Sequence, residues 1–598
     1  MKKAYVKHPI VDASLAKTKA NASSKKNGVG KFFCQAVRTI LGFLFFSLVG
    51  LSSWGISQEK VDAVSFRMLE FPFSPSFDLP SNGRLSNINP DHFSSPSLTV
   101  QLNAVQSTVA HCVAGNPVPD AINAEIVRLL SLDSPPAILR ATVSAAIHLN
   151  LKEAAPQLLH IAGQDSTLAM QIEPALARWS YEPAHEYWLR RLASDAKLDA
   201  QIQALQGLRS LKDLKDQPIL ENILQGSLHA TIRIAAAQAL GTIHDSGLEE
   251  LAKQRLRLPD ETGHFMAALE AARLIENHQS QEAIAILTEL CQSINYSAAN
   301  VAFRSLAKLK FPDRTNVAMD GLQHADPNVR KTCVQFIADL ESVEYISKVA
   351  DAMTDAIPEN RQHATSLMAT LAKKESMQDA VIENTTRTLL DTRWQGKEQA
   401  IQLACALEMR DSIPRLFELA EDPSRDVFVT AAWGLRKLVQ SPDDLKRALD
   451  LTTRLTDNTK QVKMKVPTTV DDFHRIAHLL ELLGEQRYEP AAGFMERFIP
   501  KDSGYHTVAR ATAIWGLGSI FDGLPTATCR NKIEDRMMDF RGQNPENIFV
   551  RYVATVAIGR IGDESAIPLL EQIPEPSATP AGQARDWSIQ NIRNRASK

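Results

Sequence analysis

The chain has 598 residues, of which 44% are hydrophobic and only 6% aromatic, and it holds 26 glycines. This composition supplies ample apolar surface for a buried core and favours an all-helical fold. The net charge of −3 is divided unequally, because the first 38 residues carry nine lysines or arginines against one aspartate, which leaves 57 basic against 68 acidic residues for the remainder. A strongly acidic remainder is unsuited to binding nucleic acid, and we predict no such partner.

An uncharged stretch follows this basic leader. Residues 39–56 are eighteen positions without a charged side chain, including the apolar run 40–46, and this length is just enough to cross a bilayer. We expect the leader, residues 1–35, to be disordered and, by the positive-inside rule, cytoplasmic. We therefore predict a transmembrane helix or signal anchor at residues 36–56 of a single-pass membrane protein, with the repeat domain periplasmic or extracellular.

The uncharged stretch has a second interpretation. It has the composition of the central region of a cleaved signal peptide, and Ser53-x-Gly55 offers a small-residue cleavage site. In that case the protein is secreted. A buried helix of a soluble domain fits less well, since the stretch is apolar on all sides.

Residues 57–97 form the predicted linker between this segment and the rest of the chain. They are rich in proline, serine and asparagine. Such a composition favours an extended, irregular chain that holds the following domain away from the membrane.

A helical pattern returns about every 31 to 36 residues after residue 98. Its clearest copy, residues 232–243, places apolar side chains at i, i+3, i+4, i+7, i+8 and i+11, which is one stripe along an α-helix. Gly241 predicts the end of that helix, and Asp245 and Ser246 predict a turn and the N-cap of a second helix that begins near Leu248. The copy is therefore one antiparallel helix pair.

Further copies extend to the C-terminus. They begin near Ile138, Asp165, Asp199, Asp260, Tyr296, Asp326, Pro358, Gln395, Asp422, Asp471, Tyr505 and Asn547. For residues 98–598 we predict an all-α fold, an α-solenoid of about 13 to 14 stacked antiparallel helix pairs.

The repeated motif resembles HEAT repeats of the short type found in bacterial proteins and in phycobilin-lyase-like chains. The resemblance is carried by the Asp-x-x-Val-Arg opening, an alanine-rich middle and a Gly-x-Ile-Gly ending. It implies a stacked ladder of the opening aspartate and the arginine, here Asp326 and Arg330. By position alone it extends to Arg140, Arg233 and Arg551, whose repeats lack the aspartate. We interpret these arginines as structural, because such ladders stabilise repeat stacking.

One histidine pair is a candidate metal site. His474 and His478 lie four residues apart, on one face of a predicted helix that begins with Asp471 and Asp472, a spacing that suits a transition metal. The aspartates equally suit N-caps, and no third ligand is evident, so we predict no metal and no cofactor. Iron-binding HEAT-type hydroxylases need several His-Glu pairs, whereas this chain has only His185-Glu186.

Three other features have two interpretations each. A segment containing Lys460, Lys463 and Lys465 lengthens one repeat, and residues 522–546 lengthen another; each is either a docking element or ordinary loop growth. The aromatic residues between 179 and 188 either line a groove or fill the core between repeats.

The sequence therefore predicts a membrane-anchored, extracytoplasmic HEAT-type scaffold that binds protein partners and is not an enzyme. Two alternatives stay open. One is a secreted form of the same scaffold, with its signal peptide cleaved. The other is a metal-dependent or lyase-like enzyme that uses the groove of the array.

Overall fold

The computed structural model describes residues 89–113, 115–193, 197–258, 266–462, 470–576 and 579–597. Within these residues all regular structure is helical. The described residues belong to one compact unit that spans residues 66–598. The predicted leader (1–35), the predicted membrane segment (36–56) and most of the predicted linker (57–97) lie outside the described residues. None of the helices in the described part has the length and apolarity needed to cross a membrane.

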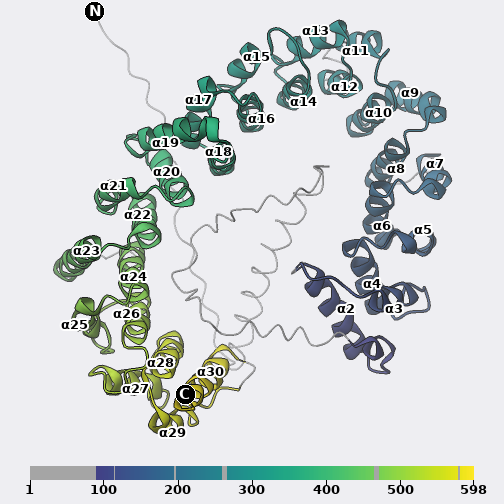
Figure 1. Cartoon of the computed structure of the whole chain (residues 1–598). Helices are drawn as coiled ribbons and strands as arrows, with labels where there is room; N and C mark the ends of the chain where they lie inside the picture. Colours follow the sequence, from purple (N-terminus) through teal and green to yellow (C-terminus); the bar gives the residue numbers. More distant parts are fainter. Residues whose placement is uncertain are drawn as a thin grey trace, which may run out of the picture. The chain divides into compact units, whose positions relative to one another are not determined.

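The described helices form two layers that alternate along the chain (Figure 1). The even-numbered helices stack on one another in chain order, and each odd-numbered helix packs beside the even-numbered helix that follows it. The even layer consists of α2 (Leu98–Val113), α4 (Pro136–His148), α6 (Ser166–Arg178), α8 (Leu198–Leu211), α10 (Ala230–Ile243), α12 (Ala267–Leu274), α14 (Tyr296–Ala307), α16 (Pro327–Ala338), α18 (Pro358–Leu371), α20 (Trp394–Ala406), α22 (Arg425–Leu438), α24 (Val470–Glu485), α26 (Thr507–Ile520), α28 (Ile548–Ile561) and α30 (Pro580–Ala596).

The odd layer covers one side of the even layer. It consists of α3 (Asp120–Arg128), α5 (Ala155–Gln164), α7 (His185–Ala193), α9 (Gln217–Gly226), α11 (Glu249–Leu256), α13 (Gln281–Leu290), α15 (Arg314–Gly321), α17 (Ile346–Asp351), α19 (Glu375–Leu389), α21 (Ile413–Leu419), α23 (Pro442–Val462), α25 (Ala492–Met495), α27 (Arg530–Met538) and α29 (Ile567–Leu570). Pairing α3 with α4 through α29 with α30 gives 14 helix pairs in the described part of the chain. The predicted all-helical solenoid is confirmed.

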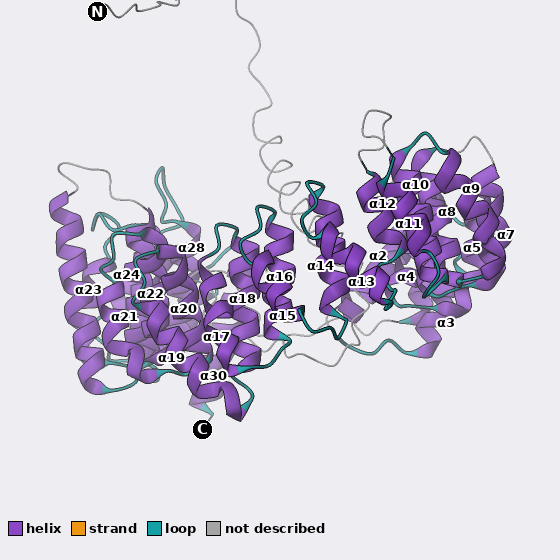
Figure 2. Ribbon diagram, turned by 90° about the horizontal axis from the view of Figure 1, so that it is seen from above, coloured by secondary structure: helices purple, strands orange, loops and turns teal. Residues whose placement is uncertain are grey.

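Short 3-10 helices precede or follow many odd-numbered helices. They are η1 (Pro90–Ser94), η2 (Lys152–Ala154), η3 (Glu182–Ala184), η4 (Leu214–Asp216), η6 (Val343–Tyr345), η7 (Ala352–Thr354), η8 (Arg410–Ser412), η9 (Glu489–Ala491), η10 (Glu496–Phe498) and η11 (Glu564–Ala566). These turns reverse the chain within a few residues, so consecutive helices run antiparallel and the even-numbered helices begin at one edge. Figure 2 shows the connecting loops at the ends of the stacked helices.

Helix α10 illustrates why the repeated motif folds in this way. Ile232, Ala236, Ala239 and Leu240 from the predicted stripe are buried, and Ala237 outside the stripe is buried too. The wider buried surface arises because α10 packs against α8 and α12 in its own layer and against α9 in the other. A central helix in a two-layer stack therefore buries three sides, which is more than one amphipathic stripe.

The role predicted for Gly241 is wrong in detail. Helix α10 continues past Gly241 to Ile243, and a Cβ atom at position 241 would lie 2.3 Å from the carbonyl oxygen of Arg273 on α12. The glycine therefore permits close contact between α10 and α12, and it does not end the helix. The predicted N-cap is also wrong, because α11 begins after Leu248 without a side-chain cap.

The aromatic residues between 179 and 188 fill the core. Trp188 is fully buried, and its indole occupies the space that a side chain at Gly207 would need, since a Cβ there would lie 2.2 Å from the ring. Trp179 and Tyr181 pack against the same hydrophobic cluster. The packing interpretation of these aromatics is confirmed.

Candidate functional site

The loops that lead from an odd-numbered helix into an even-numbered helix form one edge of the stack. We call these loops, together with the first residues of the even-numbered helices, the loop edge (Figure 2). Its described residues are 95–98, 129–136, 165–166, 197–198, 227–230, 257–258, 266–267, 291–296, 322–327, 355–358, 390–394, 420–425, 470, 499–507, 539–548, 571–576 and 579–580.

Large apolar side chains are concentrated on the loop edge. Among the described residues, those that are both large and exposed at this edge are Leu98, Leu132, Leu198, Leu228, Ile294, Tyr296, Leu390, Trp394 and Ile548. The loops of the opposite edge, with the last residue of α2, carry only Val113, Leu214, Val343 and Leu524. Leu228 is 95% exposed and Ile294 is 82% exposed. Side chains as exposed as Leu228 and Ile294 contribute little to the core. The excess of exposed apolar residues makes the loop edge the candidate contact surface.

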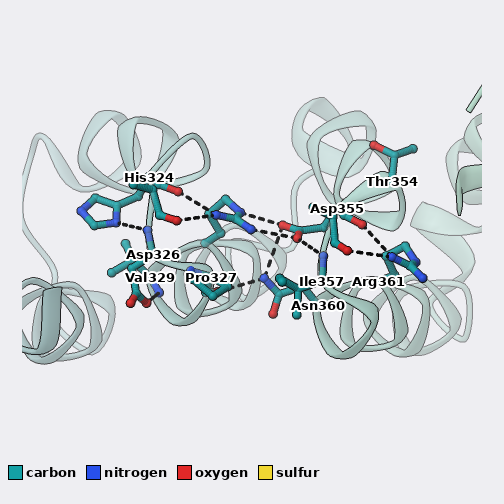
Figure 3. A network of polar contacts seen from close by, with 12 residues as sticks. His324, Asp326, Pro327, Val329, Thr354, Asp355, Ile357, Asn360 and Arg361 are labelled. Atoms are coloured by element: carbon teal, nitrogen blue, oxygen red, sulfur yellow. Dashed lines mark hydrogen bonds and ion pairs between the residues drawn. The ribbon is translucent and has the colours of Figure 1, made fainter. Parts of the chain in front are cut away.

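The loop edge also carries the arginine ladder. Arg330, in the first turn of α16, donates from Nε to Oδ2 of Asp355 at 2.7 Å and from Nη2 to Oδ1 at 2.9 Å. Its Nη1 donates to the carbonyl oxygens of His324 and Ala325. Arg361, in the equivalent position of α18, donates in turn to the carbonyl oxygen of Asp355 (Figure 3). One guanidinium thus fixes its own loop and the loop of the next repeat.

The same arrangement recurs along the stack with different acids. The fourth residue of an even-numbered helix pairs with a carboxylate of the next repeat in Arg233–Glu270, Arg330–Asp355, Lys397–Asp422, Arg510–Glu546 and Arg551–Glu575. In the described residues, the acid of each pair lies 24 to 37 residues after the base. We call these pairs rungs. Each rung joins two successive repeats, so its role is structural.

The ladder differs from the one that the resemblance implied. Asp326 does not bond to the arginine of a neighbouring repeat; its side chain accepts from the backbone N–H groups of Asn328 and Val329 and caps α16. Arg140 is exposed and forms no ion pair within the described part of the chain. Arg233 and Arg551 form rungs although their own repeats lack the opening aspartate.

Two of the rung carboxylates, Asp355 and Glu546, are held ionised. Burial alone would raise the pKa of Asp355, but hydrogen bonds from Arg330, the backbone of Ile357 and Asn360 outweigh it and bring the pKa below its ordinary value. Burial and the bonds from Arg510 act in the same way on Glu546, whose pKa is also lowered. Both acids are therefore charged at neutral pH, and each rung is an ion pair.

A cavity of about 800 Å³ opens beside the Arg330–Asp355 rung. It is lined by residues of the α15–α16 loop, of α16, of α17 with η7, and by Arg393 at the start of α20. Three cations, Arg330, Lys348 and Arg393, face two acids, Asp351 and Asp355. The cavity therefore carries a net positive charge in an acidic chain.

The two acids of this cavity already have basic partners. Arg330 holds Asp355, as described, and Arg387 donates to Asp351 at 2.8 Å. By contrast Lys348 is exposed and has no ion-pair partner among the described residues. Arg393 pairs with the half-buried Asp391 beside it through Nε and Nη2, and its own side chain is 55% exposed. The cation of the cavity without an ion-pair partner among the described residues is thus Lys348, and Arg393 is a second cation that remains open to solvent.

Two aromatic side chains flank the cavity along the stack. Tyr296, 47% exposed at the start of α14, meets the ring of His324 edge-on, with the ring centroids 5.3 Å apart. His324 lines the cavity, and its Nδ1 accepts from the N–H of Asp326, so Nε2 is the donor of the neutral ring. Trp394, 36% exposed, follows Arg393 on the other side and lies under the guanidinium of Arg361.

The two histidines proposed as metal ligands lie on α24. His478 is fully buried, and neither ring nitrogen has a hydrogen-bond partner. Burial, with Arg436 and His474 nearby, lowers the pKa of His478 to about 3. In the described residues no cluster of three or more potential ligands occurs. Arg436 pairs with Glu481 and Glu485 at the same place, and this adjacent guanidinium disfavours a cation there.

The His-Glu pair and the two lengthened repeats are further candidates that the sequence singled out. His185 contacts Asp216 at 2.8 Å, while Glu186 is mostly exposed. Residues 522–546 contain α27, the odd-layer helix of its pair, so this lengthening is part of a repeat. In the other lengthened repeat, α23 extends to Val462, and the segment with Lys463 and Lys465 lies outside the described residues.

The comparisons with known proteins agree with a solenoid of short helical repeats. Residues 550–573 match the model of the PBS lyase HEAT-like repeat, which places the matched motif on α28 and α29. This match supports the HEAT-type repeat that the sequence indicated. No curated protein sequence matches the chain.

Among solved structures the chain is similar to large helical-repeat proteins. A structure of Kap95p, whose binding changes the switch loops of RanGDP, is 13% identical with a TM-score of 0.45, and the match covers 86% of this chain and 72% of that one. Importin beta in an ammonium sulfate condition is 14% identical with a TM-score of 0.43, covering 86% and 73%. Yeast importin-beta (Kap95p) is 12% identical with a TM-score of 0.42, covering 84% and 72%. Our assignment of the fold rests on the helix pairs themselves.

Proposed function

We propose that the chain is a scaffold that binds protein partners through its loop edge. The observation that carries the proposal is the unequal distribution of exposed apolar side chains, nine at the loop edge and four at the opposite edge of the described residues. Protein interfaces have apolar and aromatic centres with arginine nearby, and the loop edge combines these residue types. A stack of repeats presents such a surface continuously, since each repeat adds one loop to the row.

The second part of the proposal is the location of the scaffold. The uncharged stretch within residues 36–56 anchors the protein in a membrane, the basic residues 1–35 remain cytoplasmic, and the solenoid is periplasmic or extracellular. The support is the charge asymmetry of the sequence around the uncharged stretch. The secreted form, with its mature N-terminus beyond Ser53, is the alternative.

Site-specific photocrosslinking in intact cells tests the scaffold. Benzoylphenylalanine replaces Leu228 or Ile294 on the loop edge, and Leu214 or Val343 on the opposite edge serve as matched controls with exposed apolar side chains. We expect discrete protein adducts from the loop-edge positions and none from the controls. Equal labelling from both edges, or no adduct at the loop edge, contradicts the proposal.

Two measurements on the same cells test the membrane anchor and the side of the membrane on which the repeats lie. Alkaline carbonate extraction should leave the full-length protein in the membrane, and protease added outside the cytoplasmic membrane should cut the repeats but spare the leader. A soluble protein whose mature N-terminus lies beyond Ser53 would establish the secreted form instead. Stoichiometric metal in the purified protein, lost in His474→Ala and His478→Ala variants, would support the enzyme alternative.

A further inference from the structure

We propose that the cavity beside the Arg330–Asp355 rung, with its two flanking aromatic residues, binds an extended peptide that carries an acidic residue between two apolar residues. The inference rests on the proposed scaffold function and assigns one binding site and one chemistry within it. We call the site the α14–α20 groove and define it by Tyr296, His324, Lys348, Arg393 and Trp394.

The first step is the positive charge of the cavity. The cavity holds three cations and two acids, and both acids are engaged by Arg330 and Arg387. Lys348 and the exposed part of Arg393 are therefore the groups that a ligand meets. An ammonium and a guanidinium donate to carboxylate oxygens with charge-assisted bonds, which are stronger than neutral ones. The remainder of the chain is acidic, so this local positive charge selects an acidic segment of a partner.

The second step is the polar donor beside the aromatic end. His324 is held in place by the N–H of Asp326 on Nδ1 and by the edge-on contact with Tyr296. With Nδ1 accepting, Nε2 is the donor atom of a side chain that lines the cavity. A peptide carbonyl or carboxylate is the complementary acceptor. The cavity therefore presents donors from three different repeats, as an extended main chain or acidic side chain requires.

The third step is the pair of apolar anchors. Tyr296 and Trp394 are large, partly exposed and begin α14 and α20, and Leu390, 64% exposed, lies close to Trp394 in the chain. Aromatic side chains of this kind bury much apolar area at little cost in conformational entropy, which makes them frequent centres of binding energy. Arg361 over the Trp394 ring fixes the orientation of the indole.

The spacing of the anchors sets the length of the ligand. Helices α14, α16, α18 and α20 are successive members of the even layer, and packed helices lie about 8–10 Å apart. Three such steps separate the anchors by about 24–30 Å, and an extended chain advances about 3.3 Å per residue. The ligand is therefore a segment of about eight or nine residues, apolar near both ends and acidic near its centre.

The test uses the full-length protein in detergent and a phage-displayed library of random nonapeptides. We expect enriched sequences with aspartate or glutamate near the centre and apolar residues about four positions to either side. One enriched peptide, labelled with fluorescein, is then titrated against variants by fluorescence anisotropy. Enrichment of basic peptides, or no enrichment at all, overturns the proposal.

The variants separate the groove from the rest of the surface. Lys348→Glu combined with Arg393→Glu should weaken binding by about tenfold or more, and Trp394→Ser and Tyr296→Ser by a similar factor. The matched controls are Lys373→Glu, an exposed lysine near the opposite edge, and Val343→Ser, an exposed apolar residue there; both should bind as the parent does. Lys348→Arg should retain binding, which excludes misfolding as the cause of the loss.

Two further outcomes distinguish a peptide-binding groove from a lipid-binding surface and from the remainder of the loop edge. If anionic phosphatidylglycerol vesicles bind with the same dependence on Lys348 and Arg393, and peptides do not, the groove recognises a lipid surface and the proposal is wrong. If loop-edge crosslinks to proteins persist in the double charge-reversal variant while peptide binding is unchanged, the scaffold stands and the assignment of this groove fails. Absence of crosslinks in the parent protein contradicts the scaffold itself.

Discussion

Arg330 and Asp355 are 25 residues apart in the sequence, yet they form a two-point ion pair across the boundary between two repeats. The guanidinium also holds two carbonyl oxygens of its own loop. This relationship joins the stacking of the repeats to the cavity that we propose as a binding site, because the same pair forms one wall of it.

We expect a large loss of stability when the buried Arg510–Glu546 rung is broken. In Arg510–Glu546 the two side chains are 5% and 1% exposed, so Arg510→Met leaves Glu546 without its main partner and should cost about 3 kcal/mol. Hydrogen exchange in α26 and α28, with the denaturation midpoint, measures this loss. Arg425→Met, which removes an exposed arginine, should change stability by less than about 1 kcal/mol. Adding Glu546→Leu to Arg510→Met should restore part of the loss; no recovery would mean that the charge is not the cause.

A side chain at position 241 should destabilise the protein by a steric clash between α10 and α12. In Gly241→Ala the new methyl group would meet the carbonyl oxygens of Arg273 and Leu274 at 2.3 and 2.5 Å, and separating α10 from α12 should cost about 1–3 kcal/mol. Gly163, near the end of α5, has open space where a Cβ would lie, so Gly163→Ala should be neutral or stabilising by up to about 1 kcal/mol. Thermal unfolding of both variants checks the contrast, and equal melting temperatures would rule out the proposed clash.

Glu173 predicts a loss of stability as the pH rises. Burial raises the pKa of Glu173 from 4.5 to about 7, opposed by Arg191, by the hydrogen bond from Tyr187 and by the nearby Trp188. Because the folded pKa exceeds the unfolded one, the stabilising contribution is complete below about pH 4.5 and is lost as the pH rises towards 7. The expected loss is about 3 kcal/mol. Glu173→Gln should flatten the difference in denaturation midpoint between pH 5 and pH 8, and an unchanged slope would contradict this assignment.

For His478 we expect the opposite dependence of stability on pH. Its pKa of about 3 in the folded chain lies below the ordinary 6.5, so its contribution to stability is complete above pH 6.5 and is lost as the pH falls towards 3. His478→Leu removes both unpartnered ring nitrogens and should unfold at lower pH than the parent protein. Circular dichroism during acid titration measures the midpoint. His148→Leu, an exposed histidine on α4, is the control and should leave the midpoint unchanged.

The sequence predicted the repeats better than the contacts between them. Tyr296 and Pro358 begin α14 and α18 as the periodic pattern predicted. The prediction succeeded because each repeat contains its own apolar stripe, and this stripe packs the helices. The acceptors of the rungs were missed. Asp355 and Glu546 lie 25 and 36 residues after their arginines. Because the loops differ in length, the sequence separation between base and acid varies, although the ion pairs occupy equivalent positions in the stack.

The cavity was missed for a related reason. Lys348 comes from α17 and Arg393 from the start of α20, and neither residue belongs to the repeated motif. Only the stacking of their two repeats brings them together. The sequence did contain one indication of the cavity. Large apolar residues such as Tyr296 and Trp394 stand at the starts of helices, where packing of the core does not require them, and both are partly exposed in the structure.

The rungs bear on how such an array can change its length during evolution. The repeat formed by α17 and α18 contributes Asp355 as acceptor for the repeat before it and Arg361 as donor within its own loop and towards the next. A gene duplication that copies one whole repeat therefore supplies a donor and an acceptor together and leaves no charge unmatched. A deletion that removes part of a repeat separates them. The repeating element of the ladder is thus the complete helix pair with its entering loop.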